Sequence, residues 1–290
     1  MRARAVRRVG LAVIVVGTVG CGGGKVAGDG GGGAGALGER ARRVAEAWDG
    51  SKAAAVWRAG YHPVGEETRL PRGGLRGEDQ QAYERRNLTA RGALPDGGPE
   101  DGEVAWAAGG SVARPVVSAR EAYEALAGPR AAGTPRLVVE EVAAGRMRID
   151  TTRGPASVPA WVFTLDGYAS PLVRAAVEPS PTPRSPIGPA HDLPGRRLDR
   201  LLDIADDGRS VTVVAVHGVC DDGPRVRVRE TRGSVVLTAS VVDREGEQPC
   251  TAQGKLERVV VKLRAPLGDR VLLDAVTGGP VPCRGPVPGW

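Results

Sequence analysis

Aromatic and histidine side chains are scarce in this chain of 290 residues. Phe, Trp and Tyr together make up 3% of the sequence, and the only histidines are His62, His191 and His217. The motifs of several enzyme classes are missing as well, since the sequence contains no G-x-S-x-G, no H-E-x-x-H and no G-K-[ST]. We therefore assign no catalytic residues and no cofactor from the sequence.

A hydrophobic run long enough to cross a membrane is also absent. The run Leu11–Val19 has nine residues, so it covers about 15 Å as a helix, roughly half of the hydrocarbon thickness of a bilayer. It follows a segment with four arginines and no acidic residue. This pattern is typical of a secretory signal peptide, which we place at residues 1–20. The adjacent Arg7 and Arg8 leave the twin-arginine route open beside the general secretory route.

Cys21 stands directly after this run. The residues Thr18-Val19-Gly20-Cys21 resemble the lipobox of bacterial lipoproteins, whose cysteine receives a diacylglycerol and becomes the mature N-terminus. The alternative is an ordinary secreted protein with a cysteine near its cleavage site. Residues 21–38 are rich in glycine and suit a flexible tether. We therefore expect Cys21 to be lipidated and the protein to lie on the outer face of the cytoplasmic membrane, anchored by lipid.

A strong excess of charge is absent once the signal peptide is set aside. The formal net charge is +6, but four of the 40 basic residues lie in the first ten positions, which leaves 36 basic and 34 acidic residues. A body so close to neutral has no strong field that attracts polyanions over a distance. We therefore exclude nucleic acid as a partner.

Cysteines are few. Cys220, Cys250 and Cys283 remain after Cys21, and an exported protein meets an oxidising environment in which disulfides persist. We predict a Cys220–Cys250 disulfide because these residues flank a strand-rich segment, and such a loop would stabilise the fold by about 3–4 kcal/mol. The sequence alone does not exclude the other two pairings, which involve Cys283.

The first part of the mature chain combines helices with short strands. Residues 39–60 predict helix, broken at Asp49-Gly50-Ser51, with Ser51 as the N-cap of a second helix and with Trp48 and Trp57 as core anchors. Residues 61–117 predict short strands between turns. Ser118 and Glu121 form a capping box for a helix at 118–127.

The remaining residues are rich in strand patterns. Residues 137–177 predict an antiparallel meander of four strands, with the first turn at Ala143-Ala144-Gly145. The predicted class is α+β and strand-rich, with N-terminal helices plus the antiparallel meander, followed by a C-terminal antiparallel β-sandwich-like sheet. The expected units after the tether are an α+β domain at 39–178, a proline-rich linker or surface loop at 179–195, and a β-rich domain at 196–290.

Two groups of residues carry chemistry. Arg225, Arg227 and Arg229 alternate with valines, so all three lie on one face of a strand; this face is either simply solvated or an anion-binding patch suited to envelope polymers such as teichoic-acid phosphates. His217, Cys220, Asp221 and Asp222 form a close cluster that could bind zinc or copper with Cys250 as a further ligand. We assign no metal, because a disulfide and an Asp-Asp-Gly turn explain the same residues.

Several longer stretches resemble a family of actinomycete lipoproteins with no assigned activity. The stretches are AEAWDGS, VWRAGYHP, LPRGG, TTRGPASVPAWVFTLDGY and LRAPLGDRVLLDA, and the resemblance spans roughly residues 40–275. It implies an exported, membrane-tethered protein with a body of mixed helix and strand. It carries over no catalytic residue.

Three functions remain open from the sequence. The first is a non-enzymatic binding or accessory module of the cell envelope, anchored to the membrane by its N-terminal lipid, with a cell-wall polymer or an envelope protein as partner. The second is an envelope enzyme, such as a hydrolase, whose residues converge only in the fold. The third is an assembly partner of a membrane complex, which exposed apolar patches would indicate.

Overall fold

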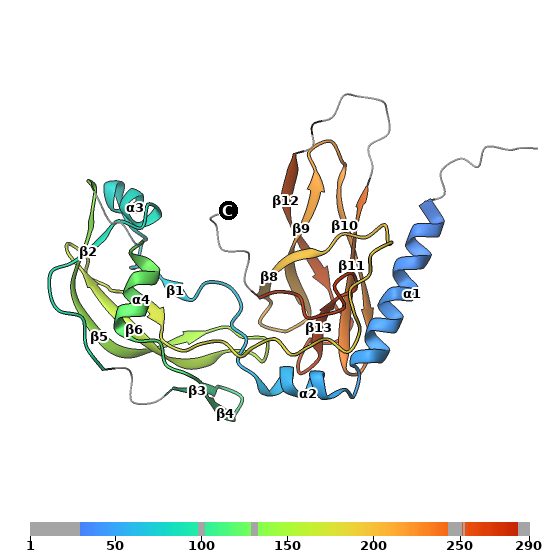
Figure 1. The fold of residues 1–290 in the computed structure, drawn as a ribbon, viewed down its shortest axis with the longest axis horizontal. Coiled ribbons are helices and arrows are strands. Elements are labelled where there is room, and N and C mark those ends of the chain that lie inside the picture. Colours follow the sequence, from blue (N-terminus) through green and yellow to red (C-terminus); the bar gives the residue numbers. More distant parts are fainter. Residues whose placement is uncertain (1–29, 98–101, 129–132, 243–250, 252, 284–290) are drawn as a thin grey trace, which may run out of the picture.

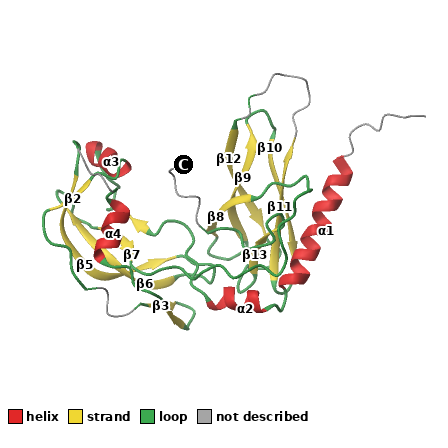
Figure 2. Ribbon diagram, viewed as in Figure 1, coloured by secondary structure: helices red, strands yellow, loops and turns green. Residues whose placement is uncertain are grey.

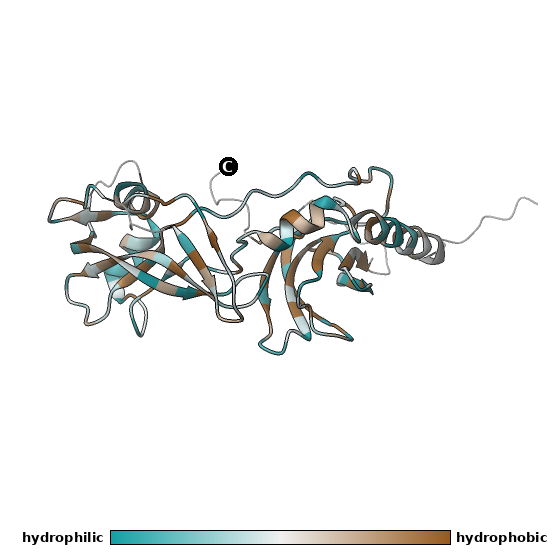
Figure 3. Cartoon of the chain, turned by 90° about the horizontal axis from the view of Figure 1, so that it is seen from below, coloured by the Kyte–Doolittle hydropathy of each residue, from teal (hydrophilic) through white to brown (hydrophobic). Residues whose placement is uncertain are grey.

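The computed structural model describes residues 30–97, 102–128, 133–242, 251 and 253–283. Over these residues the chain forms four helices and thirteen strands in three sheets, which confirms the α+β, strand-rich class (Figure 2). The elements form two lobes that lie side by side (Figure 1). Figure 3 shows the two lobes from a second direction, with apolar residues mostly on the strands.

The first lobe is built on one seven-stranded sheet. Its elements are β1 (Thr68–Arg69), α3 (Gly77–Glu84), β2 (Leu88–Ala90), β3 (Glu103–Trp106), β4 (Ser111–Ala113), α4 (Ala119–Leu126), β5 (Leu137–Ile149), β6 (Ala156–Leu165) and β7 (Leu172–Ala175). Strand β6 is central, because β5 pairs with one of its edges while β3 and β7 share the other. Trp161 and Phe163 of β6 pack in a core with residues of α3 and α4.

The meander has three strands, not the four predicted. The expected turn at Ala143-Ala144-Gly145 is wrong, since these residues lie within the continuous strand β5, where Gly145 is paired with Ala160. A Cβ atom on Gly145 would lie 2.8 Å from Cγ2 of Val162. The glycine therefore permits a close approach between strands and does not mark a turn.

Two predictions for the helices of this lobe have different outcomes. The capping box is confirmed, because the Glu121 backbone N–H donates to Ser118 Oγ and the Glu121 carboxylate accepts from the Ser118 backbone N–H. The prediction of strands alone for residues 61–117 is wrong, since α3 lies within them. Ala82 is the one buried residue of α3, so the helix carries no apolar periodicity that would predict it.

The second lobe contains two facing sheets. Its strands are β8 (Leu198–Ile204), β9 (Ser210–Gly218), β10 (Gly223–Glu230), β11 (Ser234–Val242), β12 (Gly254–Lys262) and β13 (Val271–Asp274). The sheets, ordered β10-β11-β13 and β12-β9-β8, enclose an apolar core that includes Val213, Leu237 and Leu272. This arrangement is sandwich-like, as predicted. One pair differs from the predicted antiparallel arrangement, because β11 and β13 run parallel.

The N-terminal helices belong to this second lobe. Helix α1 (Gly30–Trp48) and helix α2 (Lys52–Ala59) cover the outer face of the β10-β11-β13 sheet, where Val44, Trp48 and Trp57 pack with Val236 and Leu273. The grouping of these helices with the meander in one unit, 39–178, therefore does not match the packing. The first lobe is instead inserted between the helices and β8. The break at Ser51 and the buried tryptophans are confirmed.

The predicted tether is partly helical. Helix α1 begins at Gly30, so residues 30–38 are not a flexible segment, whereas residues 21–29 lie outside the described residues. Glycine disfavours helix by about 1 kcal/mol per residue, but tertiary packing supplies most helical stability in proteins. Leu37 is buried, and Gly33 lies close to Pro194, so contacts with the second lobe extend the helix toward its N-terminus.

The proline-rich segment 179–195 is a fixed surface segment. The Ser180 backbone N–H donates to Tyr61 O at 2.8 Å, and the Ala190 backbone N–H donates to Val276 O at 2.8 Å. Ile187 packs against the core beneath α1 and α2. Of the two predicted alternatives, linker or surface loop, the structure favours the surface loop; it runs from the first lobe along the second to β8 (Figure 1). No helix among the described residues has the length and hydrophobicity needed to span a bilayer.

Candidate functional site

Strand β10 carries the three predicted arginines on the face that α1 partly covers. Arg225, Arg227 and Arg229 are paired in register with Ser240, Thr238 and Val236 of β11. Val236 packs under α1, while Val226 on the opposite face of β10 packs into the core between the sheets. The alternation therefore places all three arginines on one face, as predicted, and helix α1 lies next to them.

A groove runs between α1 and β10. A concavity of about 630 Å³ is lined by Arg196, Arg225, Arg227 and residues of α1, and a second one of about 360 Å³ continues it along Arg229 and Arg264. The two share Ala34, Arg227 and Thr238, so they form one continuous surface. We name it the arginine groove and define it by its five arginines: Arg196, Arg225, Arg227, Arg229 and Arg264.

Few carboxylates line this groove. Among the described residues that line it, the carboxylates are Asp221 and Glu230, so the five arginines exceed these by three positive charges. Asp221 accepts a hydrogen bond from the Gly218 backbone N–H at 2.5 Å. Among the described residues, no ion pair within 4 Å involves Arg225, Arg227 or Arg229. All three residues are exposed. Glu39 on α1 acts on Arg229 without a contact within 4 Å, since the pKa of Glu39 is lowered mainly by its hydrogen bond with Arg42 and in smaller part by the charge of Arg229.

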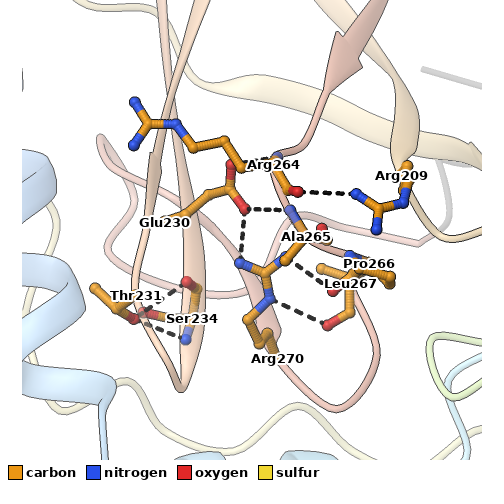
Figure 4. A network of polar contacts seen from close by, with 9 residues as sticks. All are labelled: Arg209, Glu230, Thr231, Ser234, Arg264, Ala265, Pro266, Leu267 and Arg270. Atoms are coloured by element: carbon orange, nitrogen blue, oxygen red, sulfur yellow. Dashed lines mark hydrogen bonds and ion pairs between the residues drawn. The ribbon is translucent and has the colours of Figure 1, made fainter.

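Glu230 closes one end of the groove and is occupied by other donors. Its carboxylate accepts from Arg270 Nη1 at 2.8 Å and from the Arg264 backbone N–H at 2.8 Å (Figure 4). Arg270 also donates to the carbonyls of Ala265 and Pro266, which holds the connection between β12 and β13 against the end of β10. Burial opposes ionisation of Glu230, but the hydrogen bonds from Arg264 and Arg270 outweigh it and lower its pKa. Glu230 is therefore already engaged and does not neutralise Arg227 or Arg229.

Other arginines on the surface differ from these. Arg42 pairs with Glu39 and Glu46 on the exposed face of α1, and Arg91 pairs with Glu140 and Asp166 in the first lobe. Each of these arginines faces two carboxylates, so its charge is locally balanced. The unbalanced arginines of β10 are the ones suited to bind an external oxyanion, because a guanidinium offers two parallel N–H donors to such a group.

The cluster around His217 contains a turn cap and a contact between the histidine and a carboxylate. Asp221 caps the turn after β9 through the Gly218 backbone N–H, which agrees with the turn interpretation. His217 is buried, and its Nε2 lies 3.2 Å from Glu257 Oε2. Within the described parts of the chain, no group of three or more His, Cys, Asp or Glu residues could hold a metal ion.

The predicted covalent sites are only partly placed. Cys21 and Cys250 lie outside the described residues, so lipidation at Cys21 and the Cys220–Cys250 disulfide stay predictions. Cys220 lies in the turn that follows β9. Cys283 is half-buried beside the cores of the second lobe, and its Sγ lies 3.9 Å from Val281 O.

His62 is not arranged as a catalytic base. Its ring stacks on Trp57 with centroids 3.6 Å apart, and its Nε2 lies 3.2 Å from the Trp57 carbonyl oxygen. Burial lowers the pKa of His62 to about 4; the hydrogen bond to Trp57 opposes this shift, and the positive charge of Arg114 adds to it. The ring of His62 is buried, so the neutral, stacked histidine contributes to packing between the lobes.

Sequence reasoning found the three arginines of β10 but missed the rest of the groove. Arg196 and Arg264 come from loops distant in sequence, and α1 reaches the sheet through contacts across about 190 residues. The alternation of Arg and Val along β10 was enough to predict that the three arginines lie on one face of the strand. No local signal in the sequence shows which helix packs beside it.

Acidification tests the environment of His62. Its pKa is about 4 in the fold and about 6.5 in the unfolded chain, so the unfolded state takes up the proton first as the pH falls below 6.5. The stability that neutral His62 contributes is present above pH 6.5 and is lost progressively toward pH 4. Urea unfolding should show that the native chain loses about 2 kcal/mol more between pH 7 and pH 5 than His62→Gln does. Equal losses in both proteins would contradict this account of His62.

Comparison of the chain with protein-family models, with curated proteins and with solved structures finds no match. A fold alone does not specify a function, and the chemistry of a site does. The functional argument therefore depends on the arginine groove and on the N-terminal sequence.

Proposed function

We propose that this protein is a membrane-anchored, extracytoplasmic lipoprotein that binds an anionic polymer of the cell envelope in the arginine groove. The observation that carries the proposal is the row of Arg225, Arg227 and Arg229, exposed in a groove and not paired with any carboxylate of the described residues. The proposal includes no chemical step. The protein acts in it as a binding or accessory module.

The spacing of the row supports a ligand with repeated charges. Residues two apart on a strand are separated by about 6.6–6.8 Å, so the guanidinium groups of β10 form a regular series along the groove. Teichoic-acid phosphates are envelope polymers with negative charges repeated along a chain. Several weak, charge-assisted contacts to one such chain add up without a deep pocket.

The N-terminal sequence supports the place of action. The basic start, the short apolar run and Cys21 predict export and lipidation. Helix α1, which forms one wall of the groove, begins at Gly30, nine positions after Cys21. Nine residues span at most about 32 Å, so a lipid on Cys21 would keep the groove close to the membrane surface.

A second candidate function, assembly with an envelope protein, has one observation in its favour. Leu256 and Val260 on the outer face of β12 are 56% and 64% exposed. They lie four residues apart on one strand face, in register with Val216 and Thr212 of β9. Exposed apolar residues that lie together favour protein contacts.

The triple variant Arg225→Gln, Arg227→Gln, Arg229→Gln tests the binding site. We expect it to bind a long-chain polyphosphate at least about tenfold more weakly than the native chain, because it lacks three charge-assisted donors. Isothermal titration calorimetry at fixed salt measures the difference. The matched control replaces Arg91, Arg120 and Arg136 by Gln, which removes the same net charge from exposed positions of the first lobe. Equal binding by the triple variant and its control would show that the groove is not the site.

The variant Cys21→Ala tests the anchor. In a host that processes lipoproteins, we expect the native protein in the membrane fraction and Cys21→Ala in the soluble fraction, because the lipid acceptor is lost. Mass spectrometry of the native N-terminal peptide should show a diacylglyceryl group on Cys21. An unmodified peptide that begins elsewhere would rule out the lipoprotein part of the proposal and leave the groove untested by this result.

A further inference from the structure

A second basic concavity lies in the first lobe, far along the chain from the arginine groove. It has a volume of about 680 Å³ and lies between the loop that precedes α3 and the loop that joins β6 to β7. Its wall contains Arg69, Arg72, Arg76 and Tyr168, and Leu70 and Val173 add apolar surface. We name it the Tyr168 pocket. It includes the LPRGG stretch, which the proposed function does not use.

Two of its guanidinium groups are held in place by neutral partners. Arg69 Nη2 donates to Arg148 O at 2.7 Å, and Arg76 Nη2 donates to Gly167 O at 3.0 Å. The Arg76 guanidinium also lies over the ring of Tyr168, 4.9 Å from its centroid. Carbonyl and ring contacts fix the orientation of a guanidinium without cancelling its charge, and they leave further N–H donors for a ligand.

Two hydrogen bonds hold the hydroxyl group of Tyr168 in place. Its hydroxyl donates to Asp79 Oδ2 at 2.8 Å and accepts from the Arg76 backbone N–H at 3.0 Å. The loop that carries Arg72 is closed by the Gly74 backbone N–H, which donates to Pro71 O at 2.9 Å. Gly73 and Gly74 have φ values of +81° and +76°, which glycine adopts without strain. The pocket is thus formed before any ligand arrives.

Carboxylates are absent from the lining of this pocket, all of which lies in described residues. In the same residues, no ion pair within 4 Å involves Arg69, Arg72 or Arg76. Arg91, in the same lobe, is instead neutralised by Glu140 and Asp166. Arg69 also lines a neighbouring concavity whose wall contains Glu66, Asp150 and Asp203. The like charges of Arg69, Arg72 and Arg76 on one pocket wall repel one another, and an oxyanion bound there relieves that repulsion.

We infer that the Tyr168 pocket binds a diphosphate ester. Each guanidinium fork engages two oxygens, so three of them match the oxygen-rich diphosphate better than a single phosphate. The group attached to the diphosphate packs on the apolar surface of Leu70 and Val173. This site is separate from the arginine groove and does not require the polymer proposed for that groove.

The test titrates inorganic pyrophosphate into the full chain by calorimetry. The parent is the triple Gln variant of Arg225, Arg227 and Arg229, so that the groove does not contribute. We expect one pyrophosphate per chain, and at least about tenfold weaker binding when Arg69, Arg72 and Arg76 are also replaced by Gln. The control adds Gln at Arg91, Arg120 and Arg136 instead and should bind as the parent does. Orthophosphate should bind the parent at least about tenfold more weakly than pyrophosphate.

A single substitution tests the pocket with less risk of unfolding the chain than the triple variant. The Arg72 side chain makes no hydrogen bond or ion pair to described residues, so Arg72→Glu should fold as the parent does and still bind pyrophosphate at least about tenfold more weakly. Equal binding by the pocket variants and the control would overturn the inference and leave the groove proposal standing. A further outcome is that the pocket variants lose affinity for pyrophosphate while the groove variants keep their affinity for polyphosphate. This result would support the inference and overturn the groove proposal.

Discussion

The packing of α1 on the outer face of β11 and β13 is the contact on which the second lobe and its groove depend. Val44 and Trp48 are fully buried there, and Trp48 Nε1 donates to Gly278 O at 2.7 Å. Arg40 is buried on the same side of the helix and donates to Ala275 O at 2.9 Å. Burial of these side chains stabilises the lobe by roughly 1.5–3 kcal/mol for each large apolar residue. Apolar burial therefore attaches α1 to the sheet, and the hydrogen bonds of Trp48 and Arg40 fix its position there.

This packing gives the arginines of β10 a different environment from that of a free sheet face. Val236, the register partner of Arg229, lies under α1, so the helix runs beside the arginine row and turns it into one side of a groove. Asp221 and Glu230, the carboxylates among the described lining residues, are engaged by backbone N–H groups or by Arg270. An oxyanion from outside would thus meet exposed positive charge that no carboxylate of the described residues pairs within 4 Å. The binding capacity we propose follows from this arrangement and not from net charge, since residues 21–290 contain 36 basic and 34 acidic residues.

Local signals in the sequence predicted the local features correctly. The capping box at Ser118, the helix break at Ser51 and the single face of Arg225, Arg227 and Arg229 all depend on residues a few positions apart. The wrong predictions involve long-range packing. Residues 30–38 are helical because Leu37 and its neighbours contact the second lobe. Gly145 lies within β5 because it pairs with Ala160 of β6, and the lack of a side chain there leaves room for Val162. The same limit explains why α1 and Arg264 could not be placed at the groove beforehand.

The central claim is that the arginine row of β10 binds oxyanions because those guanidinium groups have no carboxylate partner within 4 Å in the part of the chain that the structure describes. The most direct measurement follows the arginine Nε resonances of the full chain by NMR during a titration with polyphosphate. The account predicts that the resonances of Arg225, Arg227 and Arg229 shift early and saturate together, while that of Arg42, already paired with two glutamates, stays in place. Shifts spread evenly over paired and unpaired arginines would contradict it.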